Sequence, residues 1–185
     1  FNNSDISVAN GTLSTMNSSN NITWIGTFTP SSNVEDTSNL ITLSSSYTDT
    51  LGNSGISATT SNYVVDTKSP SVSSFTISDS TLISGETATV SLIFSDIVSN
   101  FNNSDISIAN GTLSTMNSSN NITWVGTFTP STNVEDTSNL ITLSSSYTDT
   151  LGNSGISATT NNYVIDTKSP SCLLYTSDAA DELSC

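Results

Sequence analysis

Residues 87–95 read TATVSLIFS, a short run in which apolar side chains largely alternate with hydroxyl side chains. The apolar members at every second position are Ala88, Val90, Leu92 and Phe94. This alternation is typical of a β-strand with one face in a core and the other towards solvent. Residues 121–130, NITWVGTFTP, show the same pattern. One face of that run holds Ile122, Trp124, Gly126 and Phe128.

Five further segments between these two runs and around them resemble short strands bounded by Gly, Asn, Asp and Ser. They cover about 72–78, 105–110, 112–116, 140–147 and 156–166. No window has a helical period, and Asn110-Gly111 indicates a tight turn between two of the strands. Seven half-buried strands in about 100 residues predict an all-β fold, a β-sandwich of the wider immunoglobulin-like class, with Trp124 in its core.

The chain is a tandem repeat with a period of 100 residues. Residues 1–70 match residues 101–170 at 65 of 70 positions without a gap. A period of this length fits whole domains in a row, because solenoid repeats are shorter. We therefore expect a complete immunoglobulin-like unit at 71–170, here called the second unit. Residues 1–70, the first unit, lack counterparts of 71–100, so we expect a truncated domain without its first two strands, in a chain that is a fragment.

The last residues differ from the repeat. In the tail, residues 171–185, Ser171 still matches Ser71, but the sequence from Cys172 onward resembles nothing in the repeat. Residues 172–181 resemble a translation of the transposon adapter used in sequencing libraries. We expect a non-native or disordered tail. Both cysteines, Cys172 and Cys185, lie in it, and a disulfide between them is the alternative interpretation.

The composition excludes several classes of function. Sixteen acids and two lysines give a net charge of −14, which disfavours binding to nucleic acid or to an anionic membrane surface. No stretch is apolar enough for membrane insertion. The chain has no His or Arg and, outside the tail, no Cys, so most catalytic designs lack their residues and we expect no enzyme activity. A field of this sign attracts divalent cations.

Several motifs of the second unit together resemble a known family. They are FSDIVSNFNNSDISIANGTLS, TFTPS, YTDTLGNSG and YVIDTKSP. Their order and spacing are similar to those of the bacterial immunoglobulin-like repeats of large secreted or surface-anchored adhesins. The resemblance implies an extracellular location, neighbouring repeats as partners, and a spacer or stalk that supports cell adhesion or biofilm. A host or matrix ligand would then bind domains outside this fragment.

Two other functions stay open. Each repeat would be a carbohydrate- or protein-binding module if aromatic side chains such as Tyr147 and Tyr163 were exposed on one face, although packing roles suit them too. The third possibility is an accessory domain of a secreted carbohydrate-active enzyme.

The sequence also predicts a calcium site at the junction between units. Immunoglobulin topology places the start of a domain beside the loops after its second strand and before its last. The oxygen-bearing candidates at this end are Asp66, Asp96, Asp149 and Asn153, with Asp105 as a further candidate. Oxygen ligands without nitrogen or sulfur suit calcium, with a Kd of ~10⁻⁴–10⁻³ M.

The alternative is that these carboxylates only cap turns and end strands. Glu135 and Asp136 are expected at the opposite end of the domain, solvated or holding a second, weaker ion.

Overall fold

The computed structural model describes residues 1–171. The predictions about the tail and about a Cys172–Cys185 disulfide lie outside the described residues. The regular secondary structure of the described residues is almost entirely β-strand. Within this part, no helix is long and apolar enough to span a membrane.

One layer of the second unit is a four-stranded antiparallel sheet in the order β13–β14–β10–β8. Its strands are β8 (Val72–Ile77), β10 (Ala88–Phe94), β13 (Gly111–Leu113) and β14 (Thr123–Pro130). The central strands β10 and β14 are the two runs whose alternation predicts strands. They pair over six residues, from Ala88↔Phe128 to Ile93↔Thr123.

The facing layer consists of short strands. They are β9 (Thr81–Ile83), β11 (Val98–Ser99), β12 (Ile106–Ser107), β15 (Glu135–Asn139), β16 (Thr142–Leu143), β17 (Thr148–Asp149), β18 (Ala158–Thr159) and β19 (Tyr163–Asp166). They form the ladders β15–β19–β9, β12–β16–β18 and β11–β17. A single-turn 3-10 helix, η2 (Asn103–Asp105), precedes β12.

The side chains between the two layers form one continuous core. The alternate residues of β10 are all buried, as their pattern predicts, and Phe128 of β14 is buried with them. Trp124 is partly buried and packs on this core, with its ring 4.8 Å from that of Phe101. The all-β prediction is confirmed, and the architecture is a sandwich.

The expected first strand, 72–78, is present as β8, and the structure adds strands that the sequence does not predict. After β8 the chain turns and adds β9, which pairs in parallel with β19. The segment around Glu135 and Asp136, for which the sequence predicts no strand, is strand β15, paired with β19, and Glu135 is exposed. Its sequence EDTSN has no apolar alternation from which a strand could be predicted. Main-chain hydrogen bonds to β19 place this segment in the sheet.

The first unit reproduces only the later part of this fold. It contains η1 (Asn3–Asp5) and the strands β1 (Ile6–Ser7), β2 (Gly11–Leu13), β3 (Phe28–Pro30), β4 (Glu35–Asn39), β5 (Thr42–Leu43), β6 (Ala58–Thr59) and β7 (Tyr63–Asp66). It has no counterparts of β8 to β11, and large apolar side chains such as Ile22 and Ile25 are 85% and 71% exposed.

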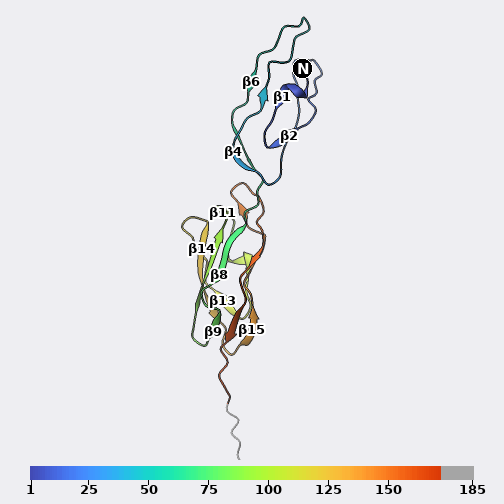
Figure 1. Cartoon of the computed structure of the whole chain (residues 1–185). Coiled ribbons are helices and arrows are strands. Elements are labelled where there is room, and N and C mark those ends of the chain that lie inside the picture. The colour runs from blue at the N-terminus through green and yellow to red at the C-terminus, as the bar shows by residue number, and fades with distance from the viewer. Residues whose placement is uncertain (172–185) are drawn as a thin grey trace, which may run out of the picture.

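The two units lie end to end (Figure 1). The chain leaves the first unit after β7 and enters the second at the end that carries β11. Strands β9 and β15 lie towards the opposite end of the second unit. The connection between the units, residues 67–71, is therefore the place where one repeat meets the next.

Candidate functional site

The last residues of the first unit dock onto the second unit. The carbonyl of Pro70 accepts a hydrogen bond from the Tyr147 hydroxyl at 3.2 Å and another from the Ile156 main-chain N–H at 3.0 Å. Pro70 is buried, whereas its repeat counterpart Pro170 is exposed. Both prolines end the same TKSP sequence, so the difference comes from the second unit that follows Pro70. We call the groups that hold residues 66–70 the linker seat.

A second contact comes from the loop before the last strand. The side-chain Nδ2 of Asn153 donates to the main-chain carbonyl of Asp66 at 3.1 Å. The same nitrogen donates to Asp149 Oδ2 at 2.7 Å, which fixes the Asn153 amide in place. The linker is thus held at Asp66 and at Pro70 by groups of one loop, residues 147–156.

Asp149 organises this loop from a buried position. Its Oδ1 accepts hydrogen bonds from the main-chain N–H groups of Leu151 and Asn153, each at 2.9 Å. Burial acts to raise the pKa of Asp149, but the hydrogen bonds from the Asn153 side chain and from the loop backbone outweigh it and hold the pKa below its ordinary value of 3.8. The carboxylate is therefore ionised and serves as the acceptor that closes the loop.

The first unit contains the same loop without a linker docked on it. Asp49 accepts from Leu51 N and Asn53 N at 2.8 and 2.9 Å, and Asn53 Nδ2 donates to Asp49 Oδ2 at 2.8 Å. Asp49 is exposed, while Asp149 is buried. Since the hydrogen bonds agree in the two copies, the loop has its shape before the linker docks. The linker seat is preorganised.

Lys68, one of the two basic residues of the chain, lies at this junction. Its ammonium lies 2.8 Å from Glu35 Oε2, and the pKa of Lys68 is raised, first by this hydrogen bond and pair, then by the charges of Asp96 and Asp66. A small hollow between the units is lined by Glu35, Lys68, Pro70 and Asp96, among others. Lys68 therefore places a positive charge among carboxylates of both units.

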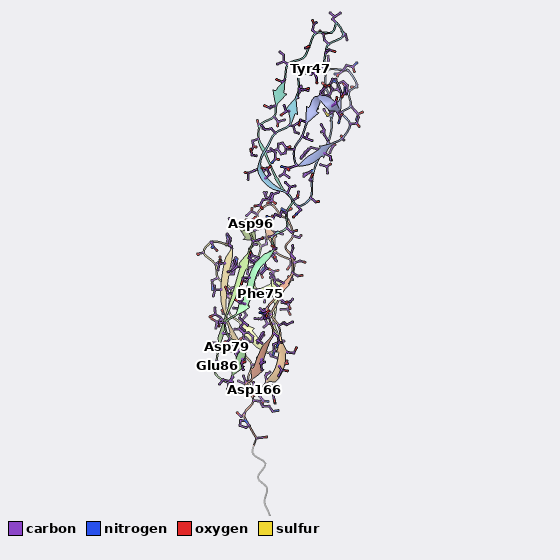
Figure 2. The ribbon with its side chains drawn as sticks, viewed as in Figure 1. Tyr47, Phe75, Asp79, Glu86, Asp96 and Asp166 are labelled. Carbon is purple, nitrogen blue, oxygen red and sulfur yellow. The ribbon has the colours of Figure 1, made fainter. Side chains whose placement is uncertain are left out.

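The structure brings most of the predicted calcium ligands to this end, but in other roles. Asp66 meets Asn153 through its main-chain carbonyl, and its Oδ1 accepts from the Lys68 N–H at 3.1 Å. Asp96 Oδ1 accepts from the N–H of Ile97 at 2.6 Å. Figure 2 shows Asp96 at the end of the second unit that faces the first, and Asp166 at the opposite end.

The further candidate has a separate place. Asp105 is buried, caps η2 by accepting from Asn102 N at 2.9 Å, and accepts from the Ser146 hydroxyl. Across residues 1–171, no three or more acidic, histidine or cysteine side chains are grouped as a metal site would require. The observed geometry fits hydrogen bonding, so the calcium site stays a prediction.

The acids at the opposite end also have protein partners. Glu135 pairs with Lys168 at 3.1 Å, and Asp136 Oδ2 accepts from Asn110 Nδ2 at 2.8 Å. The same Asn110 nitrogen donates to the buried Asn139 at 2.8 Å. The expected second ion site would have to compete with these contacts.

The two tyrosines considered for ligand binding are fully buried. Tyr163 lies in the core with its ring 5.5 Å from that of Phe128. Tyr147 holds the linker, a role that sequence reasoning missed. The only available signal was its position at the start of the YTDTLGNSG loop, which also carries Asp149 and Asn153.

The sequence of the chain is similar to one family of known domains. A family model described as a bacterial Ig-like domain matches residues 1–65 and residues 66–165, which is most of the chain. The second match begins at Asp66 and includes the docked linker. No curated protein and no solved structure shows a significant match to the chain. The two adjoining matches agree with the repeat and with the sandwich, and the chain belongs to the bacterial immunoglobulin-like domain family.

Proposed function

We propose that the chain is a spacer in an extracellular bacterial surface protein, in which repeats in series hold an adhesive domain away from the cell. The observation that supports this role best is the docked linker. Hydrogen bonds to Asp66 and Pro70 fix the exit of one unit against the entry of the next, and five linker residues leave little free chain. A stalk needs this restriction of bending at every junction.

The near-identity of the two units supports the same proposal. A linker seat built from Tyr147, Asn153 and Ile156 is present in the first unit as Tyr47, Asn53 and Ile56. Each repeat therefore carries both halves of a junction, a TKSP exit and a seat. Such a chain extends by adding repeats, and each repeat contacts only its neighbours.

The test is the distance between equivalent points of the two units. Spin labels at Ser45→Cys and Ser145→Cys, both exposed positions, report this distance in a chain whose Cys172 and Cys185 are replaced by serine. We expect a single narrow distance distribution. A matched variant with four glycines inserted after Pro70 should give a broad one. A native distribution as broad as that of the insertion variant would refute the spacer proposal.

A further inference from the structure

The end of the second unit that carries Asp166 presents three exposed side chains in a row. Strand β19 lies between β15 and β9, and the register pairs Asp166 with Glu135 on one side and with Ile83 on the other. All three side chains are exposed, although Ile83 is a large apolar residue. The end of the ladder therefore reads acid, acid, isoleucine.

A tight turn holds Ile83 in this position. The Ile83 N–H donates to Glu86 Oε2 at 3.0 Å, and the Glu86 N–H donates to the Ile83 carbonyl at 3.2 Å. Gly85 completes the turn with a φ of 86°, a conformation that glycine adopts without strain. Figure 2 shows Glu86 and Asp166 towards the same end of the unit. A single exposed isoleucine is ordinary on a protein surface, so its place relative to the junction decides its role.

The junction between the two units shows what the first two positions of this row meet. Glu35 and Asp66 are the copies of the two acids and pair in the same register. Glu35 lines the small hollow together with Asp96 of the second unit. The Asp66 carbonyl accepts from Asn153 of the loop 147–156. The row thus runs across the second unit from Asp96 to this loop, and its third position continues in the same direction.

The exposure of Asp66 supports this direction. Asp66 is partly buried, whereas Asp166 is exposed, even though the first unit has no copy of β9 beside Asp66. The second unit is therefore what covers Asp66. Neighbouring strands of a sheet lie about 5 Å apart. In a complete preceding unit, the residue at the position of Ile83 lies one strand away from Asp66 and within reach of the same loop.

The loop offers two apolar side chains to such a residue. Leu151 at its tip is 62% exposed, and Ile156 at its base is 51% exposed while its N–H is bonded to the Pro70 carbonyl. Both lie within three residues of Asn153, which already holds the preceding unit. Burial of large aliphatic side chains against one another is favourable in water.

We propose that, where two complete units follow one another, Ile83 of the preceding unit packs against Leu151 and Ile156 of the following unit. The contact rests on the proposed spacer function, since it needs repeats in series. It adds an apolar contact to the linker seat, on the side of the linker away from Lys68. Contacts on both sides of a linker resist tilting in both directions, whereas a contact on one side resists it in one.

The experiment measures the alkylation rate of a thiol introduced by Ile83→Cys in the second unit, in the native chain and in an extended chain. The native chain also carries Cys172→Ser and Cys185→Ser, so that one thiol is present. In the extended chain, a second copy of residues 71–170 follows Pro170 in place of the tail. We expect iodoacetamide to react at least about fivefold more slowly with the extended chain, because a side chain in a closed junction reacts only while the junction is open.

Loop variants identify the partner of this thiol. Leu151→Ser and Ile156→Ser in the added unit should restore the fast reaction. The same substitutions in the second unit, whose loop faces the first unit, should not. A thiol introduced instead by Val125→Cys is the control for a general effect of the added unit. Val125 is 42% exposed and lies in β14 of the other sheet, so it should react equally in both chains.

Spin labels at Ser145→Cys in the second unit and at its copy in the added unit distinguish this contact from the spacer function. A narrow distance distribution with an unprotected thiol at position 83 overturns the contact while the units still lie in a fixed arrangement. A broad distribution with an unprotected thiol overturns both. Protection that neither loop variant relieves also overturns the contact, since other groups would then cover the thiol.

Discussion

The hydroxyl of Tyr147 and the carbonyl of Pro70, 77 positions apart in the chain, form a hydrogen bond across the junction of two repeats. The hydroxyl's single hydrogen is shared with the Ile156 carbonyl, which lies closer at 2.8 Å, and the hydroxyl oxygen accepts from the Ile156 N–H at 3.1 Å. The Ile156 N–H is itself shared with Pro70. Tyr147, Ile156 and Pro70 thus connect the core, the loop and the linker.

Replacing Tyr147 with phenylalanine should loosen this junction. The ring would still fill the core, but the carbonyls of Pro70 and Ile156 would lose a donor, at a cost of about 1–3 kcal/mol. We expect a lower melting temperature for the second unit and a broader Ser45–Ser145 label distance. Calorimetry and the spin-label experiment measure these two effects.

The first unit supplies the control for this variant. Tyr47 makes the equivalent contacts with Ile56, at 3.1 and 3.3 Å, but holds no linker. Tyr47→Phe should leave the label distance unchanged. Equal broadening in both variants would show that Tyr147 does not act through the junction.

Tyr163 differs from Tyr147 in the hydrogen bonding of its hydroxyl. Its hydroxyl is fully buried, and among residues 1–171 neither it nor the Trp124 Nε1 has a hydrogen-bond partner. A buried polar group without a partner costs about 1–3 kcal/mol, and burial also raises the pKa of Tyr163. We expect Tyr163→Phe to match or exceed the native stability in urea denaturation. A loss of more than about 1 kcal/mol would indicate a partner for the hydroxyl in solution.

The sequence predicts strands where packing decides them and misses those that main-chain pairing decides. Strands β10 and β14 alternate because one face of each meets the core, so their inward residues could be named from the pattern. β9 is three residues long and pairs in parallel with β19, more than 80 positions away. No local pattern marks such a strand, and the polar β15 has the same difficulty.

For the junction, topology predicted which segments meet but not which atoms. Asp66, Asp149 and Asn153 do come together, yet Asp66 contributes its carbonyl and not its carboxylate. Side-chain type suggested ion binding, because a sequence shows carboxylates but not the main-chain N–H groups that already occupy them. The Asp49 loop of the first unit has the same hydrogen bonds without a docked linker, so residues within the loop are enough to form them.

Acid should weaken the second unit through Asp149. Its folded pKa is lowered, so the stability it contributes is fully present above the unfolded value of 3.8 and is lost as the pH falls through the folded pKa. Asp149→Asn should be less stable than the native chain at neutral pH, by about 1–3 kcal/mol. The difference should shrink below pH 3.8, because a protonated Asp149 also loses its charge.

Chemical denaturation from pH 7 to pH 2 measures this convergence. The matched variant is Asp49→Asn, which changes the exposed copy of the same loop and should leave the stability of the second unit unaffected. A native-to-variant difference that stays constant over the whole range would mean that ionisation of Asp149 does not stabilise the fold.

Calcium separates the two interpretations of the junction. The geometry indicates that Asp149 and Asn153 hold the linker by hydrogen bonds. The melting temperature of the second unit should then be the same in calcium as in a chelator. A calcium concentration of ~10 mM is suitable, because it exceeds the ~10⁻⁴–10⁻³ M Kd of extracellular modules. Asn153→Ala should lower the melting temperature equally in both solutions, since its donation to Asp66 is lost in each. Calorimetry with and without calcium measures this, with magnesium as the control for ionic strength. A rise in melting temperature that is specific to calcium and abolished in Asp149→Ala would instead establish the ion site, because repulsion among the junction carboxylates would then be relieved by the bound cation.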